Sequence, residues 1–322
     1  IGILSCFMIA DRLLIETKAE GEEALLIEID DISDYFFVRK GEREEVGTVV
    51  MLFLKEGIEI DLLGEVRRYA KHIEFPIKII LPDKTEIIEN TGLESFELKA
   101  IMDFLTEKGY TIHLIRIHDE YVEGIIGLLM EKGEIGVVPL MKKPERILES
   151  LKRQYTRYKW SSVGKISVSS EGIFIGEVVD ILPSWFESPF IFCDLNLKGN
   201  IVDLNVARND IIKNEKFYKL LDRLEELLIE GLEGYLGELE KKLTSAKIKS
   251  FEYFNNFFKF YINSYEIEKQ WKQRKLTGKL INLIREFYYF KCALKVDTGN
   301  ISTIYMRYDD IIKTRKPIIP IR

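Results

Sequence analysis

The spacing of apolar residues switches repeatedly between strand and helix periods over the first 230 residues, and it is mostly helical afterwards. Short apolar or alternating runs bounded by turn residues predict strands, whereas apolar residues at every third or fourth position predict amphipathic helices. Segments of both kinds must bury their apolar faces against one another, which requires sheets covered by helices. We therefore expect an α/β (α+β) fold that ends in a mostly helical subdomain.

The first part of the chain is expected to form a sheet followed by a helix. Four apolar-rich segments separated by turns predict an antiparallel meander, at residues 12–17, 24–29, 35–39 and 48–54. Helical spacing follows over residues 61–73. This helix should end before Pro76, because the residue that precedes a proline disfavours helical dihedral angles. Two strands are expected within residues 76–89, and Asn90-Thr91-Gly92 marks a turn at a domain boundary.

The second part mixes helices and strands. Helices are predicted over residues 94–108, with Gly109 at the C-terminal end, and over residues 144–155. Strands are predicted at residues 111–118, 124–130, 136–141, 164–169, 172–179 and 189–197. A long helix is expected from about residue 209 to residue 230. The pattern favours a middle domain with mixed or antiparallel sheets.

Beyond residue 231 the strand signals almost disappear until residues 301–308. Residues 251–261 are densely aromatic, and residues 266–289 have apolar side chains at helical intervals. Aromatic side chains at this spacing are typical of a packed core rather than of a cofactor pocket. The expected domains are therefore residues 1–90, 91–230 and 231–322.

The composition argues against several classes of protein. Of the 322 residues, 46% are hydrophobic and 31% are charged, as in ordinary globular proteins. The longest apolar runs fall far short of the roughly 20 residues that cross a bilayer, and the opening stretch lacks the features of a signal peptide. The net charge of −6 argues against binding of nucleic acid, which requires a concentrated basic face. We expect neither a membrane nor a nucleic acid as a partner.

Cysteine and histidine usage favours a reducing compartment and no metal site. Cys6, Cys193 and Cys292 are widely spaced and odd in number, which is not the pattern of a disulfide framework. His113 and His118 have no Cys or carboxylate at the spacing of a metal-ligand pair. We therefore expect a cytoplasmic protein without a metal centre.

One short segment near the start of the chain contains residues suited to binding phosphate. Gly2-Ile3-Leu4-Ser5 precedes an apolar stretch that resembles a helix. Glycine allows an anion to approach the backbone closely, and the N–H groups at a helix start attract negative charge. A single glycine before a helix is common, however, so this segment alone does not define a site. Gly47-Thr48 is locally a turn that enters a strand.

The order of several motifs gives these segments more weight. The opening run IGILSCFMIADRLLIETK is followed by GTVVMLFLKE at residues 47–56 and by FPI at residues 75–77. These runs resemble, in order and spacing, the ATP-binding domain of the ninety-kilodalton heat-shock chaperone family, to which the bacterial HtpG chaperones belong within the GHKL ATPase class. That domain contains GxFGIGFxSxFxVAxxVxVxTK, then GTxIxLxLKE and a helix ending in FxxxPI. The resemblance implies that residues 1–90 are the closing part of a GHKL-type sandwich.

Three further motifs resemble the middle domain of the same family. DILPSWF at residues 180–186 is similar to ELLPxxLxF, DLNVARND at residues 203–210 is similar to DLPLNVSRE, and HDEYVEG at residues 118–124 is similar to HxxVEG. The resemblance covers roughly residues 1–230. After residue 231 the family's small αβα unit and dimerisation domain are not recognisable. A homodimer, which the family's organisation implies for the complete protein, has no support in this chain.

The resemblance also implies a function and a set of site residues. It implies an ATP-dependent chaperone that binds client or partner proteins, with ATP and Mg²⁺ as cofactors. Gly2, Ile3 and Leu4 would contact the phosphates, and Thr48 would lie at the adenine end of the pocket. Arg208 would reach the γ-phosphate, because a guanidinium is always protonated and its planar donors match the phosphoryl oxygens.

The motif around Arg208 departs from that of the family, since SRE is replaced by Ala207-Arg208-Asn209. Any support from the family's Ser and Glu is therefore not carried over. From spacing alone a structural interpretation stays open, in which Asn205, Asn209 or Asp210 caps the following helix and Arg208 pairs with a nearby acid.

The family's nucleotide-binding Asn, its catalytic Glu and its Asp-x-Gly-x-Gly motif have no counterpart in this sequence. We therefore expect a fragment that has no ATPase activity alone, and whether the chain is an enzyme stays open. Two alternatives also remain: a protein-interaction module without nucleotide chemistry, and a divergent GHKL ATPase with another role. Relatives of the mismatch-repair or topoisomerase type would use a Lys at the γ-phosphate and a basic groove, which does not suit this acidic chain. Trp185 and Phe186 could serve as a partner surface or pack in the core.

Overall fold

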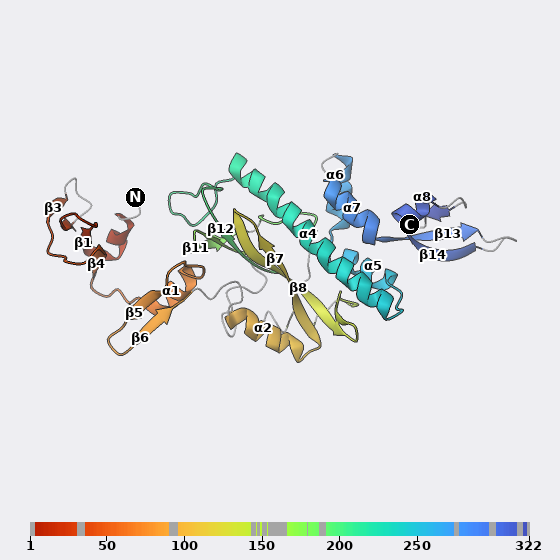
Figure 1. Cartoon of the computed structure of the whole chain (residues 1–322), viewed down its shortest axis with the longest axis horizontal. Coiled ribbons are helices and arrows are strands. Elements are labelled where there is room, and N and C mark those ends of the chain that lie inside the picture. Colours follow the sequence, from red (N-terminus) through yellow and green to blue (C-terminus); the bar gives the residue numbers. More distant parts are fainter. Residues whose placement is uncertain are drawn as a thin grey trace. The chain divides into compact units, whose positions relative to one another are not determined.

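A computed structural model describes residues 4–30, 36–89, 96–142, 146, 149, 153, 166–178, 180–186, 191–273, 277–295, 301–313 and 318–320. These residues form helices and several sheets, labelled in Figure 1, so the expected mixture of α and β structure is confirmed. The chain divides into two compact units, residues 1–65 and 66–322. The domain limits expected at residues 90 and 230 stay a prediction.

The first unit is built on a four-stranded antiparallel sheet. A short 3₁₀ helix, η1 (Leu4–Met8), precedes the strands β1 (Ala10–Lys18), β2 (Leu25–Ile29), β3 (Phe37–Lys40) and β4 (Gly47–Leu54). The expected meander is wrong for the last strand, because β4 pairs with β1 and the order is β3-β2-β1-β4. β3 is exposed throughout, which suits an edge strand, whereas β1 holds the buried Leu13 and is paired on both sides.

The division between the two units lies within α1 (Leu62–Tyr69). This helix ends before Pro76, as predicted. The hairpin of β5 (Ile77–Ile80) and β6 (Thr85–Ile88) follows it, also as predicted.

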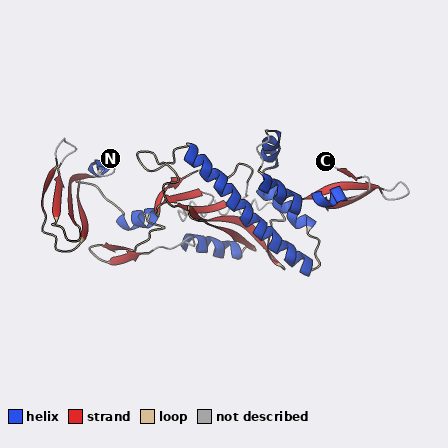
Figure 2. Ribbon diagram, turned by 45° about the horizontal axis from the view of Figure 1, so that its top comes forward, coloured by secondary structure: helices blue, strands red, loops and turns tan. Residues whose placement is uncertain are grey.

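The second unit is centred on a mixed sheet with the order β11-β10-β12-β8-β7. Its strands are β7 (Tyr110–His118), β8 (Val122–Gly133), β9 (Gly136–Val138), β10 (Ile166–Ser170), β11 (Ile173–Glu177) and β12 (Ile191–Leu197), and β9 pairs with β8. β10 and β12 are parallel, and the other pairs are antiparallel. α2 (Phe96–Thr106) and α4 (Glu215–Ser245) lie on opposite faces of β7 and β8 (Figure 1; Figure 2). The apolar run of β8 is therefore buried on both faces of the sheet.

The long helix is displaced from its expected limits. It begins at Glu215 because the side-chain oxygen of Asn214 accepts hydrogen bonds from the backbone N–H groups of Lys216 and Phe217. It ends at Ser245, so the helix end expected at residue 230 falls inside it. The helix expected over residues 144–155 lies largely outside the described residues.

The last part of the chain contains more strand than the sequence predicts. The expected helices are present as α5 (Phe251–Tyr261), α6 (Ser264–Lys272) and α7 (Gly278–Phe287), and α8 (Tyr308–Lys313) is a further helix that the sequence did not predict. A three-stranded sheet accompanies them, with β13 (Tyr289–Lys295) between β14 (Ile301–Arg307) and β15 (Ile318–Pro320). The expectation that strands vanish until residue 301 is wrong for β13. Its pairing partners lie later in the chain, so local spacing gave no signal for it.

One buried cluster joins the middle sheet to the helices on both of its faces, and it continues into α5 and α7. Trp185 and Phe186 belong to this cluster, so their interpretation as core residues is confirmed. No described helix combines the length and apolar character needed to cross a membrane.

Candidate functional site

Arg208 lies in a loop between β12 and α4 that is held by its own hydrogen bonds. Asn205 accepts a hydrogen bond at its carbonyl from Arg208 N (2.9 Å) and one at Oδ1 from Asn209 N (3.1 Å). It also donates from Nδ2 to Asn209 Oδ1 (2.8 Å) and from its backbone N to Asp210 O (3.0 Å). Asn205 therefore organises the loop rather than capping the helix.

The backbone of Arg208 is strained and its side chain is exposed. Its φ of 54° lies in the left-handed region, which costs a residue other than glycine on the order of 1 kcal/mol or more. No ion pair of Arg208 is found within the described part of the chain. The guanidinium is thus presented to solvent on a structured turn.

The structural interpretation of this motif predicts the wrong residue as the cap of the following helix. α4 is capped by Asn214, not by Asn205, Asn209 or Asp210. The predicted pairing of Arg208 with a nearby acid is also not seen among the described residues. An anionic ligand could therefore bind Arg208 without competing with any carboxylate of the described residues.

The other predicted site residues belong to the first unit. Thr48 lies in β4 and is exposed, with its Oγ1 2.8 Å from Thr17 Oγ1 on the neighbouring strand. Leu4 is the first residue of η1, whereas Gly2 and Ile3 lie outside the described residues. The strand predicted after Gly47-Thr48 is present.

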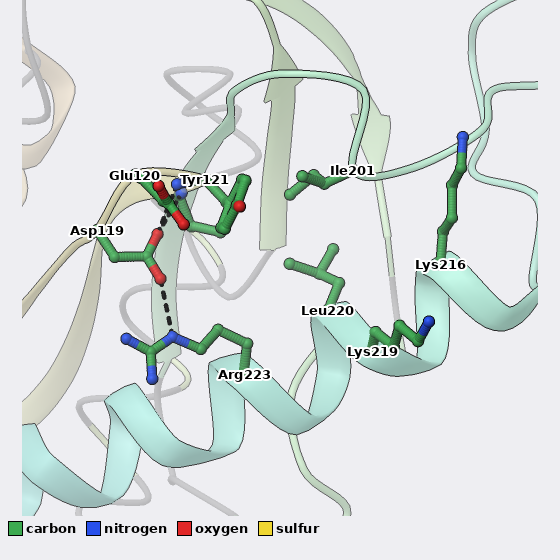
Figure 3. A pocket seen from close by; sticks show the side chains of 9 residues that line it. Asp119, Glu120, Tyr121, Ile201, Lys216, Lys219, Leu220 and Arg223 are labelled. Atoms are coloured by element: carbon green, nitrogen blue, oxygen red, sulfur yellow. Dashed lines mark hydrogen bonds and ion pairs between the residues drawn. The ribbon is translucent and has the colours of Figure 1, made fainter.

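A pocket of about 530 Å³ lies where the first turns of α4 face the turn between β7 and β8 (Figure 3). Apolar side chains of Val122, Ile201 and Leu220 line it, together with Tyr121. The charged residues that line it are Asp119, Glu120, Lys216, Lys219 and Arg223. Such a lining suits an amphipathic ligand or a protein side chain.

Ion pairs already engage the basic groups of this pocket. Lys216 pairs with Asp203 (2.6 Å), Lys219 with Glu215 (2.7 Å) and Arg223 with Asp119 (2.8 Å). These cations are therefore less available to a phosphate than the guanidinium of Arg208.

Asp119 holds the turn of this pocket against α4. Its Oδ1 accepts hydrogen bonds from the backbone N–H groups of Tyr121 and Val122 (2.8 and 2.7 Å). Burial raises the pKa of Asp119, but the hydrogen bonds from Arg223, Tyr121 and Val122 outweigh it and lower the pKa below its ordinary value.

The sequence analysis missed a buried polar cluster on the face of the middle sheet opposite α4. His72 Nε2 forms a hydrogen bond of 3.1 Å with Asp194 Oδ1, and both side chains are almost completely buried. Asp194 and Asn196 alternate with Cys193 and Leu195 along β12. Two polar residues within a strand that is otherwise apolar are the signal that could have indicated this cluster.

No group of three or more His, Cys, Asp or Glu side chains suited to a metal ion occurs among the residues that the structure describes.

Comparison with curated proteins finds sixteen that match, and all are named as HtpG chaperones. The protein from Rickettsia canadensis is 24% identical over 274 residues, which cover 80% of this chain and 40% of the relative. The protein from Helicobacter pylori is 33% identical over 90 residues (26% of this chain, 14% of the relative), and that from Roseobacter denitrificans is 32% identical over 85 residues (24% and 14%). No model of a protein family matches the chain. The resemblance to HtpG chaperones is thereby confirmed, and the chain covers less than half the length of these relatives.

Proposed function

We propose that this chain is part of an ATP-dependent chaperone similar to HtpG, in which Arg208 contacts the γ-phosphate of ATP. The observation that carries the proposal is an exposed guanidinium without a described carboxylate partner, on a strained and hydrogen-bonded loop, in a chain similar to HtpG. Strained backbone of this kind is concentrated at functional sites, where the surrounding structure compensates for its cost.

The chemistry expected of Arg208 is electrostatic. Negative charge spreads over the phosphoryl oxygens when the terminal phosphate is transferred, and a positioned guanidinium stabilises that charge. A fixed loop lowers the entropy lost when the side chain meets the phosphate. Arg208 would therefore act on turnover more than on nucleotide affinity.

The remaining assignments follow from the resemblance. The backbone of Gly2, Ile3 and Leu4 would line the phosphates, and the exposed hydroxyl of Thr48 would face the adenine end of the pocket. Mg²⁺ would be held by ATP and by residues other than those described. The partners would be client proteins in the cytoplasm.

A chimera tests the role of Arg208. It joins the part of the Rickettsia canadensis HtpG that precedes the matched segment to this chain. In it, Arg208→Ala should lower kcat for ATP hydrolysis by at least about tenfold, with KM changed less than about threefold.

Lys247 provides the matched control. It is also an exposed basic residue with a positive φ, of 57°. Lys247→Ala should leave kcat unchanged. A chimera that hydrolyses ATP equally well with and without Arg208 would remove this residue from the mechanism.

The second candidate function is a protein-interaction module without nucleotide chemistry. The pocket beneath α4 favours it, because its apolar lining suits a protein side chain. The same chimera separates the two functions, since a pure interaction module would not support ATP turnover.

A further inference from the structure

Residues 68–72 pack on the hairpin formed by β10 and β11. The rings of Tyr69 and Phe174 meet edge to face, with centroids 6.0 Å apart. Arg68 and Lys71 place their cationic groups over the ring of Phe174, at 5.8 and 5.6 Å from its centroid. Three neighbouring side chains therefore contact one aromatic residue of the edge strand β11.

His72 fixes this segment on the sheet. Its Nε2 contacts the buried carboxylate of Asp194 at 3.1 Å, and Lys71 Nζ lies 3.9 Å from the other oxygen of Asp194 and 3.5 Å from Ser167 Oγ. The backbone N of His72 donates to Gly172 O (3.3 Å). Loss of the His72 side chain would leave a buried carboxylate with fewer partners, which is costly.

The turn beneath His72 tolerates only glycine at residue 172. Glu171 and Gly172 both have positive φ, of 51° and 81°, as a two-residue type I′ hairpin turn requires. Gly172 N donates to Asn196 Oδ1 (2.9 Å). A Cβ atom on Gly172 would lie 2.5 Å from the carbonyl oxygen of His72. Asn196 and His72 therefore both hold this turn.

The other end of β11 contacts the loop of Arg208. A Cβ atom on Gly176 would lie 3.0 Å from Asn209 O, so the loop backbone rests against the strand there. Gly172 and Gly176 are separated by about 13 Å of extended strand. One short strand thus contacts His72 at one end and the residue after Arg208 at the other.

We propose that His72 is a positioning residue for the Arg208 loop. Docking of residues 68–72 fixes the β10–β11 turn, the turn fixes β11, and β11 supports the backbone beside Arg208. Because the second unit begins at residue 66, this segment is the point where the chain enters it. The consequence for phosphate binding rests on the proposed function, whereas the positioning itself is a property of this chain without nucleotide.

Amide hydrogen exchange without nucleotide tests the positioning. His72→Ala and Gly172→Ala should each raise the exchange rates of residues 205–210 at least about fivefold, because the protected amides of Arg208 and Asn209 lose their support. His72→Gln, whose amide can still donate to Asp194, should restore rates close to those of the natural chain.

Gly109→Ala is the matched control. Gly109 has a φ of 82°, but a Cβ atom on it would meet no heavy atom within 4 Å. It carries the same backbone strain without displacing His72, so residues 205–210 should exchange normally. The proposal is overturned if Gly109→Ala raises these rates as much as Gly172→Ala does, or if His72→Ala raises exchange only at residues 70–73. Neither outcome depends on nucleotide, so a failure here is distinct from a failure of the ATP chimera.

Discussion

Strand β8 of the second unit and strand β4 of the first are similarly apolar, but their side chains are buried to different extents. In β8 of the second unit, every residue from Ile125 to Met130 other than Gly127 is a completely buried hydrophobic residue. In β4 of the first unit, Val50 and Leu52 are 57% and 39% exposed. Both strands contain an apolar run, yet β8 is covered by helices on both faces (Figure 1) whereas β4 is largely exposed.

An apolar strand therefore stabilises a sheet only to the extent that another layer covers it. The register of the first sheet aligns Leu52 with Leu13, and Val50 with Ile15. These residues share one face, and part of that face is exposed. We therefore expect the free energy of unfolding to reside mainly in the second unit.

The largest expected difference comes from one substitution made in each sheet. Leu128→Ala in β8 should lower the free energy of unfolding by about 2–5 kcal/mol, because it leaves a cavity at a fully buried site. Leu52→Ala in β4 should cost less than about 1 kcal/mol.

The measurement can report on each unit separately. All three tryptophans, Trp160, Trp185 and Trp271, lie in the second unit, so their fluorescence during urea denaturation follows that unit. Hydrogen exchange of the β4 amides follows the first unit. Equal losses of unfolding free energy for the two substitutions would show that burial does not separate the two strands.

The next effect is a pH dependence confined to the second unit. Burial lowers the pKa of His113 to about 4, aided by Lys242 and opposed by Glu238. The folded state therefore keeps this imidazole neutral, while the unfolded chain binds a proton below about pH 6.5. Stability should fall as the pH decreases from 6.5 to 4, by up to about 3 kcal/mol.

His113→Gln should reduce that loss, as measured by urea denaturation monitored by tryptophan fluorescence at both pH values. The first unit contains no histidine and should show no such effect in this range. An unchanged pH dependence in the variant would mean that His113 does not cause it.

The smallest expected changes in stability come from breaking one ion pair in each unit. Asp119 is mostly buried and pairs with Arg223, so Asp119→Asn should cost about 1 kcal/mol at neutral pH. Because its pKa is lowered, this contribution is present above the ordinary carboxylate pKa and is lost as the pH falls below about 4. The pair of Glu23 and Lys40 is exposed on both sides, and Glu23→Gln should cause no measurable change. A larger effect of Glu23→Gln in thermal denaturation would contradict this ranking.

Local spacing predicted most strands of both units, because apolar runs bounded by turns are visible in the sequence. It did not predict that β4 would pair with β1, or that β13 would be a strand, since pairing joins residues distant in the chain. The contact of His72 with Asp194 spans 122 positions and was also invisible.

The candidate site was predictable only in part. Arg208 was identified through the resemblance of its motif, and nothing in its spacing indicated a positive φ. The structural alternative placed the helix cap at Asn205, Asn209 or Asp210, whereas Asn214, a residue of the same capping type later in the chain, holds that position.

A glycine at residue 208 separates the effect of the Arg208 guanidinium from that of the loop that carries it. Arg208→Gly removes the side chain and relieves the positive φ, so it should keep or raise thermal stability. In the ATP chimera, this variant should lose turnover as completely as Arg208→Ala, while Arg208→Lys should retain part of it. Full ATP turnover by Arg208→Gly would contradict the account.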